Sequence, residues 1–172
     1  MIQGYLLSLL TRQRALLGDR FDARYPHAWL VWEPGARQRP QTAADLEAGK
    51  TQLPARPGAM VPVGNDAVCF PLPEPTRPGN CLTLGRQPDS SITIDDMSVS
   101  REHARLFVRS SKWQLEPIGR ASTLVASVPI REGQSAPLSN GCTILVGGVT
   151  LTFYERLKLL ERLVAEERRS AP

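Results

Sequence analysis

Two short polar runs stand out by the chemistry they could perform together. Gly85-Arg86 ends one apolar run, and Ser100-Arg101 follows a second, with His103 two residues further on. An arginine guanidinium is a planar fork of donors that can bind two phosphate oxygens at once, and a serine hydroxyl adds a short donor. A phosphate monoester offers three acceptor oxygens and carries a charge of about −1.5 to −2 near neutral pH. The pattern favours capture of a phosphorylated residue.

Other residue clusters give no support for catalysis or a metal site. Asp95 and Asp96 are adjacent in an extended run, so their side chains would point to opposite faces and could not converge on one atom. No cluster of Cys, Asp or Glu accompanies His103, which favours a structural histidine. No Ser-His-Asp or Cys-His order indicates an activated nucleophile. We expect a binding protein that is not an enzyme and that uses no cofactor or metal.

Composition excludes further classes of function. The chain has 172 residues and a formal net charge of +4, and its positive residues, nearly all Arg, are scattered rather than clustered. That distribution does not indicate nucleic-acid binding. No run approaches the roughly 18 apolar residues that a membrane span needs. Three cysteines without a CxxC pair, in a chain with no signal-peptide pattern, favour a reducing compartment. We expect a cytoplasmic protein that binds neither nucleic acid nor membrane.

The chain from residue 66 onward has the texture of an all-β domain. Short apolar runs alternate with turn residues, and Gly147-Gly148 between two of them is typical of a tight hairpin. Such spacing predicts a β-sandwich of about 9–11 short strands. The expected strands are 66–72, 81–85, 91–94, 103–108, 112–116, 123–126, 128–131, 142–147 and 149–154.

The two ends of the chain have a helical pattern, unlike the β-rich part. Amphipathic periodicity predicts a helix over residues 1–17 and another over about 154–168. Either helix could pack on the sandwich, on the other helix, or on a second copy of the chain. Between the first helix and the sandwich we expect a strand over 28–33 ended by Pro34-Gly35, a short helix over 42–48, and a Pro- and Gly-rich linker or arm over 54–64.

These patterns divide the chain into three parts. Residues 1–60 form an N-terminal helix and arm, 61–154 the sandwich, and 155–172 a C-terminal helix and tail. The sequence leaves open whether residues 1–60 are a separate domain or a brace against the sandwich.

The ordered motifs resemble the signature of the forkhead-associated (FHA) domain. The matching runs are Leu82 to Arg86, Val99 to Ala104 and Trp113-Gln114-Leu115, and the resemblance covers roughly residues 66–154. The serine of the second run lies fourteen positions after the arginine of the first. The resemblance implies an FHA β-sandwich that binds phosphothreonine on a protein partner.

The resemblance also implies roles for individual residues. Arg86 and Ser100 would contact the phosphate, and Arg101 would add a second positive contact or shape its loop. Gly85 would supply backbone freedom or close approach. His103 would brace the binding loop without touching the ligand.

One part of the family pattern is missing. After the tryptophan strand the family usually shows Asp-x-x-Ser-x-Asn-Gly-Thr, with the Asn gripping the bound peptide's backbone. A gapless reading places Gly119 at the Ser position and Ala121 at the Asn position, so that grip is absent. Such a loss costs about 0.5–1.5 kcal/mol, roughly a factor of ten in affinity. Arg120 and Ser122 are the candidates to replace it with a different geometry.

Two functions are therefore consistent with the sequence. The first is a phosphothreonine-dependent signalling adaptor whose partner is a phosphorylated protein, such as a Ser/Thr kinase or its substrate. The alternative is an FHA-fold scaffold or oligomerisation module that no longer requires phosphate, held together as a homo-oligomer by the terminal helices.

Overall fold

The computed structural model of the chain describes residues 1–37, 61–62, 64, 66–75 and 79–170. The helix expected over 42–48 lies outside the described residues, as does most of the stretch 54–64. The described elements, in chain order, are β1 (Tyr5–Leu6), α1 (Leu7–Leu17), α2 (Arg20–Arg24), β2 (Ala28–Arg37), β3 (Val68–Leu72), β4 (Leu82–Gly85), β5 (Ile92–Thr93), β6 (Ala104–Arg109), β7 (Lys112–Pro117), β8 (Thr123–Val125), β9 (Val128–Pro129), β10 (Ala136–Pro137), β11 (Thr143–Val146), β12 (Val149–Tyr154) and α4 (Arg156–Ser170).

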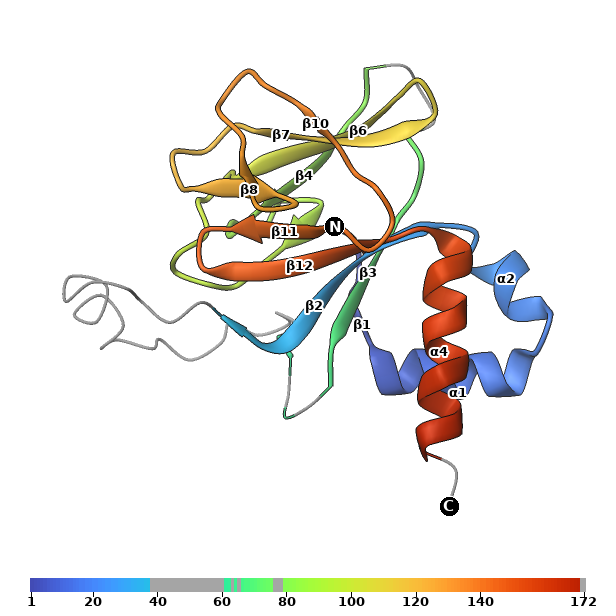
Figure 1. The fold of residues 1–172 in the computed structure, drawn as a ribbon. Coiled ribbons are helices and arrows are strands. Elements are labelled where there is room, and N and C mark those ends of the chain that lie inside the picture. The colour runs from blue at the N-terminus through green and yellow to red at the C-terminus, as the bar shows by residue number, and fades with distance from the viewer. Residues whose placement is uncertain (38–60, 63, 65, 76–78, 171–172) are drawn as a thin grey trace.

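Two sheets stack face to face and form the β-sandwich seen in Figure 1. One sheet has the strand order β1-β3-β2-β12-β11-β8-β9, and the other has the order β10-β7-β6-β4-β5. Pairing is antiparallel except between β4 and β5, which run parallel. The inward-facing residues of both sheets form one large apolar core, which includes Leu84, Leu106, Leu115, Ile144 and Leu151. The all-β sandwich predicted from the strand spacing is confirmed.

Strand β2 joins the N-terminal segment to the sandwich. It lies between β3 and β12, and both of its faces are buried. Leu30 and Trp32 enter the core between the sheets, whereas Trp29 and Val31 face the helices. The sheet therefore crosses the boundary expected at residue 60, because a strand buried on both faces is part of the domain that covers it.

The end of β2 also differs from expectation. We expected the strand to stop at Pro34-Gly35, but it continues to Arg37. The register opposite β12 is irregular there, since Trp32 pairs with Leu151 while Arg37 pairs with Val149. Gly35 has a φ of 68°, which glycine adopts without the penalty of a side chain, and the chain can resume pairing beyond the irregularity.

The first helix begins later than its periodicity predicted. Residues Tyr5 and Leu6 pair with β3 as strand β1, and α1 starts at Leu7. A Cβ on Gly4 would lie 2.8 Å from Cγ1 of Val68, so the chain can pass this close to β3 only with glycine there. Sheet pairing and core packing of the first residues outweigh their helical periodicity, as tertiary contacts often do.

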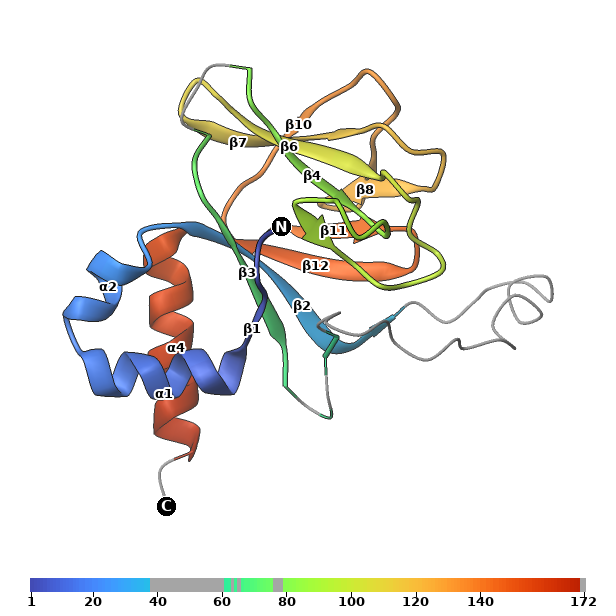
Figure 2. The ribbon, with the colours of Figure 1, turned by 180° about the vertical axis from the view of Figure 1, so that it is seen from behind.

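Helices α1, α2 and α4 form a layer on one side of the sandwich, seen from both directions in Figures 1 and 2. This helical layer covers the outer face of β2 and β3 and encloses a second apolar core. That core consists of Leu7, Leu10, Phe21, Tyr25, Trp29, Val31, Ala67, Cys69, Leu159 and Leu163.

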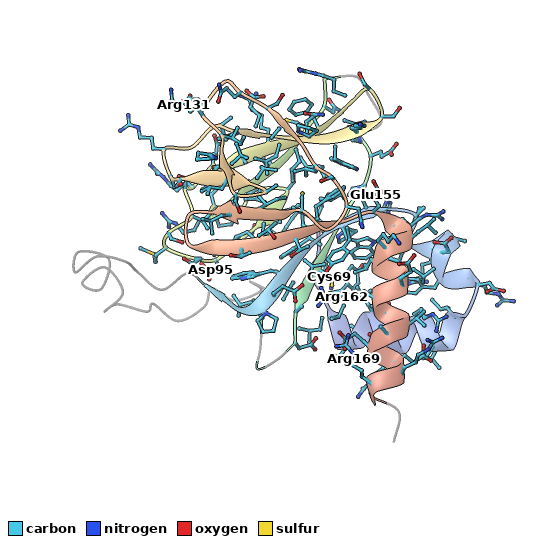
Figure 3. All side chains as sticks on the ribbon, viewed as in Figure 1. Cys69, Asp95, Arg131, Glu155, Arg162 and Arg169 are labelled. Carbon is cyan, nitrogen blue, oxygen red and sulfur yellow. The ribbon has the colours of Figure 1, made fainter. Side chains whose placement is uncertain are left out.

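Ion pairs connect the elements of the helical layer. Arg14 of α1 pairs with Glu167 of α4, and Arg156 of α4 pairs with Asp22 of α2 at 2.6 Å. Arg162 of α4 binds both carboxylate oxygens of Glu33 on β2, and Figure 3 shows it on the side of the helix near Cys69.

All three cysteines lie in the described residues as free thiols. Cys69 and Cys142 are buried free thiols and Cys81 is half-buried, and burial raises the pKa of both Cys69 and Cys142. None of the helices in the described residues has the length and apolar content to cross a membrane.

Candidate functional site

Three loops meet at the end of the sandwich away from the helical layer (Figures 1 and 2). They follow β4, β5 and β7 and contain residues 86–91, 94–103 and 118–122. We refer to them together as the loop end. Figure 3 places Asp95, in the second of these loops, on the opposite side of the molecule from Arg162.

Backbone hydrogen bonds hold the first two loops side by side. The amide of Arg86 donates to the carbonyl of Ser100 at 2.9 Å, and the amide of Gln87 donates to that of Arg101 at 3.1 Å. A Cβ on Gly85 would collide with the Arg101 carbonyl, so only glycine allows this approach. Close approach is therefore the reason for glycine at position 85, and it brings Arg86 directly beside Ser100.

The Arg86 side chain is anchored by one nitrogen and open at the other two. Its Nε donates to the carbonyl of Val99 at 3.2 Å, and the side chain is half-buried. Within the described residues, neither terminal nitrogen of its guanidinium has a hydrogen bond or ion pair with the protein. Anchoring at Nε reduces the entropy that a ligand would have to remove, while the two terminal nitrogens keep their donors.

Ser100 is held by its neighbours in a defined position. Its amide donates to Nδ1 of His103 at 3.2 Å, and its Oγ accepts from the amide of Ala121 at 3.3 Å. The hydroxyl proton is not used in that second bond, because the oxygen is the acceptor. Ser100 can therefore donate to a ligand while its oxygen stays fixed by the third loop.

His103 is fully buried and connects the loops beneath the site. Its Nε2 lies 3.0 Å from Oγ1 of Thr123 on β8. Burial lowers the pKa of His103 to about 4, so the ring is neutral at physiological pH. Nδ1 accepts from Ser100, so the ring proton must lie on Nε2, where it is shared with Thr123. Through these bonds His103 connects Ser100 in the second loop to Thr123 on β8.

The third loop approaches Ser100 through small residues. A Cβ on Gly119 would lie 2.7 Å from Oγ of Ser100 and 2.6 Å from the carbonyl oxygen of Glu102. Sequence comparison with the family pattern identified Gly119 and Ala121 only as losses. In the structure, Gly119 permits the approach and the Ala121 amide makes the bond. The signal available in the sequence was the small size of both residues.

The remaining site candidates lie on the rim. Arg101, Arg120 and Ser122 are exposed. Across the described ranges, the guanidinium groups of Arg101 and Arg120 have no carboxylate partner. The carbonyl of Ser122 accepts from the amide of Gly147 at 2.9 Å, which fastens the third loop to the β11–β12 hairpin.

Metal ligands do not gather at this end or elsewhere in the described chain. No group of three or more His, Cys, Asp or Glu residues there could hold a metal ion. The loop end instead combines guanidinium, hydroxyl and backbone N–H donors, a set suited to an anion with several oxygens.

Comparison with known proteins identifies the family to which this chain is similar. The FHA domain family model matches residues 82–147. The oxoglutarate dehydrogenase inhibitor of Corynebacterium diphtheriae is 30% identical over 115 residues, which are 66% of this chain and 76% of that protein. The same inhibitor from Corynebacterium efficiens is 31% identical over 113 residues, 65% of this chain and 71% of that protein.

Other similarities are shorter or more distant. The glycogen accumulation regulator GarA of Mycolicibacterium smegmatis is 35% identical over 85 residues, and the chain spans about half of that regulator's length. A solved FHA domain from Chlamydia trachomatis is 18% identical, with a TM-score of 0.47 over 74% of this chain and 96% of that one. From the family match and the inhibitors aligned over more than two thirds of their length, the chain belongs to the FHA-domain family.

Proposed function

We propose that the loop end binds phosphothreonine on a partner protein. The supporting observation is the pairing of Arg86 and Ser100 on two hydrogen-bonded loops, with the terminal nitrogens of Arg86 and the hydroxyl proton of Ser100 still available. Two guanidinium donors and one hydroxyl donor match the three oxygens of a phosphate monoester. The preference for threonine over serine follows from membership of the FHA family.

Contacts among the three loops order the site before a ligand binds. Gly85 and Gly119 bring the three loops into contact, and His103 fixes Ser100 from below. A site that is already ordered loses less conformational entropy when it binds. Ala121 has no side-chain amide to hydrogen-bond the backbone of the ligand. The phosphate contacts would therefore contribute a larger share of the affinity.

The chain would act by binding rather than by catalysis. The relatives are named as a regulator of glycogen accumulation and an inhibitor of oxoglutarate dehydrogenase. We infer the same general mode here, in which a phosphorylated protein such as a Ser/Thr kinase or its substrate is captured. The names of the relatives do not transfer a particular target to this chain.

Isothermal titration with a degenerate phosphothreonine peptide library tests this proposal. Arg86→Ala should weaken binding by on the order of 10- to 100-fold, since hydrogen bonds to charged groups contribute about 1.5–3 kcal/mol each. Arg86→Lys should recover only part of the loss because an ammonium lacks the planar fork. Arg20→Ala, which removes an exposed arginine of the helical layer, is the matched control and should bind normally. Equal binding of phosphorylated and unphosphorylated libraries would contradict the proposal.

The second candidate function is a phosphate-independent scaffold that oligomerises through the terminal helices. The burial of their leucines limits which residues could form that interface. Leu10, Leu159 and Leu163 are buried within the chain's own second core. Oligomerisation through the terminal helices would have to use the leucines that remain exposed, namely Leu9, Leu16 and Leu157. Sedimentation of the wild type beside Leu9→Ser/Leu16→Ser separates the two ideas, because a scaffold of this kind predicts an oligomer that the double variant disrupts.

A further inference from the structure

The turn of the β11–β12 hairpin packs against two of the three loops at the loop end. This turn is Gly147-Gly148, and the amide of Gly148 donates to Oγ of Ser98 in the second loop at 2.8 Å. The amide of Gly147 donates to the carbonyl of Ser122 in the third loop. A Cβ on Gly147 would lie 2.1 Å from the carbonyl oxygen of Ser98, so the turn can pack this closely only with glycine there. One short turn therefore holds both loops.

Ser98 connects the hairpin turn to the rest of its own loop. Its Oγ donates to Oδ1 of Asp96 at 2.7 Å while it accepts from Gly148, and its amide donates to the same carboxylate oxygen at 3.0 Å. The amide of the next residue, Val99, donates to the carbonyl of Asp96 at 3.1 Å. Ser98 is exposed, whereas Val99 is buried in the core between the sheets. The Ser98 hydroxyl therefore fixes the peptide that leads directly into Val99.

The carbonyl of Val99 is the group that anchors the Arg86 side chain. Nε of Arg86 donates to that oxygen at 3.2 Å. If the carbonyl were displaced, the Arg86 side chain would regain rotamer freedom, which a bound anion would then have to remove. A continuous path of hydrogen bonds and backbone thus joins the hairpin turn, through Ser98 and Val99, to the guanidinium of Arg86.

We propose that Ser98 is a positioning residue for the phosphate site and that it acts on Arg86 through the Val99 carbonyl. This inference rests on the proposed function, because the positioning serves the affinity for the phosphorylated ligand. Ser98 does not have to contact the phosphate for this role, since its hydroxyl proton is already donated to Asp96. Its contribution is to keep the Arg86 anchor in place.

Titration calorimetry of the full chain with the degenerate phosphothreonine library tests the proposal. Ser98→Ala should weaken binding about fivefold, the effect of losing one ordinary hydrogen bond. Ser98→Thr keeps the hydroxyl and should restore most of the affinity. Ser8→Ala is the matched control, because Ser8 is also exposed and donates its hydroxyl to an aspartate, Asp66, but lies on α1 in the helical layer. It should bind normally.

The same substitution in an Arg86→Ala background tests the path of the effect. With the guanidinium removed, Ser98→Ala should cause no further loss of affinity, because both substitutions then act on one interaction. A general loosening of the second loop would instead weaken binding by the same factor in both backgrounds. That result would overturn the positioning of Arg86 by Ser98.

The outcomes separate this inference from the proposed function. If Ser98→Ala and the wild type bind the phosphorylated library equally, and both prefer it to the unphosphorylated library, the positioning role is overturned and phosphothreonine binding is retained. A Ser98→Thr protein as weak as Ser98→Ala would also overturn the role of the hydroxyl. If phosphorylation makes no difference to the wild type, the proposed function and this inference fail together.

Discussion

Three arginines that link the elements of the helical layer and three arginines of the loop end have different surroundings. Arg14, Arg156 and Arg162 each pair with a carboxylate on another element, and these pairs link α4 to α1, α2 and β2. Arg86, Arg101 and Arg120 have no such partner in the described part of the chain, and the first of them is fixed by a backbone carbonyl instead. Arginine thus links structural elements at one side of the sandwich, whereas at the other side its side chains are available to bind a ligand.

This difference in pairing indicates that a negatively charged ligand would bind at the loop end and not at the helical layer. In the helical layer, the protein supplies its own anions, and two apolar leucines of α4 complete the packing beneath them. At the loop end, the protein supplies ordered donors, and in the described residues no ion pair joins its three arginines to a carboxylate. We therefore expect substitutions in the helical layer to change stability and substitutions at the loop end to change binding.

The largest expected effect is a loss of stability from the second core. Leu163→Ala removes a fully buried side chain of α4 and should lower the free energy of unfolding by about 2–5 kcal/mol. Urea denaturation followed by circular dichroism measures this. Phosphopeptide affinity of the folded fraction should stay the same, and a parallel drop in affinity would break the separation of the two regions.

Acid should weaken the loop end through His103. Its pKa is about 4 when folded and near 6.5 when unfolded, so the unfolded state binds the proton more readily. The contribution of the neutral ring is complete above pH 6.5 and is lost as pH falls toward 4, with a slope of up to about 1.4 kcal/mol per pH unit. Unfolding curves at several pH values, wild type beside His103→Gln, should differ by that slope. Parallel pH dependence in the two proteins would be inconsistent with a buried neutral histidine.

A paired and an unpaired arginine should respond differently to the same substitution. Arg162→Met leaves Glu33 partly buried without its bidentate partner and should cost about 1–3 kcal/mol of stability, discounted for partial exposure. Arg120→Met should change stability by less than about 0.5 kcal/mol. Denaturation midpoints compare the two variants. Equal losses of stability in the two variants would contradict the difference between paired and unpaired arginines.

The smallest expected effect concerns the fit of the third loop. A methyl group on Gly119 would press on Ser100 and the Glu102 carbonyl, so Gly119→Ala should weaken phosphopeptide binding by roughly tenfold through displacement of the Ser100 hydroxyl. Ala121→Ser keeps the backbone donor and serves as the control. Titration calorimetry of both variants checks the prediction, and undiminished affinity of Gly119→Ala would show that the Ser100 position is not critical.

Much of the sandwich could be predicted from local patterns. Each of the nine expected runs contains a strand, because alternating burial and turn residues are both visible in the sequence. The arrangement of Trp29 and Trp32 on opposite faces of β2 also agrees with the strand reading. Local patterns could not supply the partners of β2, since the pairing of residues 29–32 with 151–154 joins segments far apart in the chain.

The sequence predicted residue types for a candidate site, and only part of the geometry that the structure gives those residues. Arg86, Ser100 and His103 were identified because their side chains carry recognisable chemistry. Gly119 and Ala121 were missed because their contribution is a close approach and a backbone N–H, which no side-chain pattern displays. The start of α1 was wrong for a related reason, as the packing of Gly4 on β3 is invisible in helical periodicity.

Backbone NMR shifts during titration with a phosphothreonine library would show directly which surface binds the phosphorylated residue. The phosphorylated library should perturb amides near Arg86, Ser100 and Ala121 and leave those of α1 and α4 unchanged. An unphosphorylated library at the same concentration should cause no comparable shifts. Perturbations centred on the helical layer, or identical responses to both libraries, would contradict the assignment of binding to the loop end.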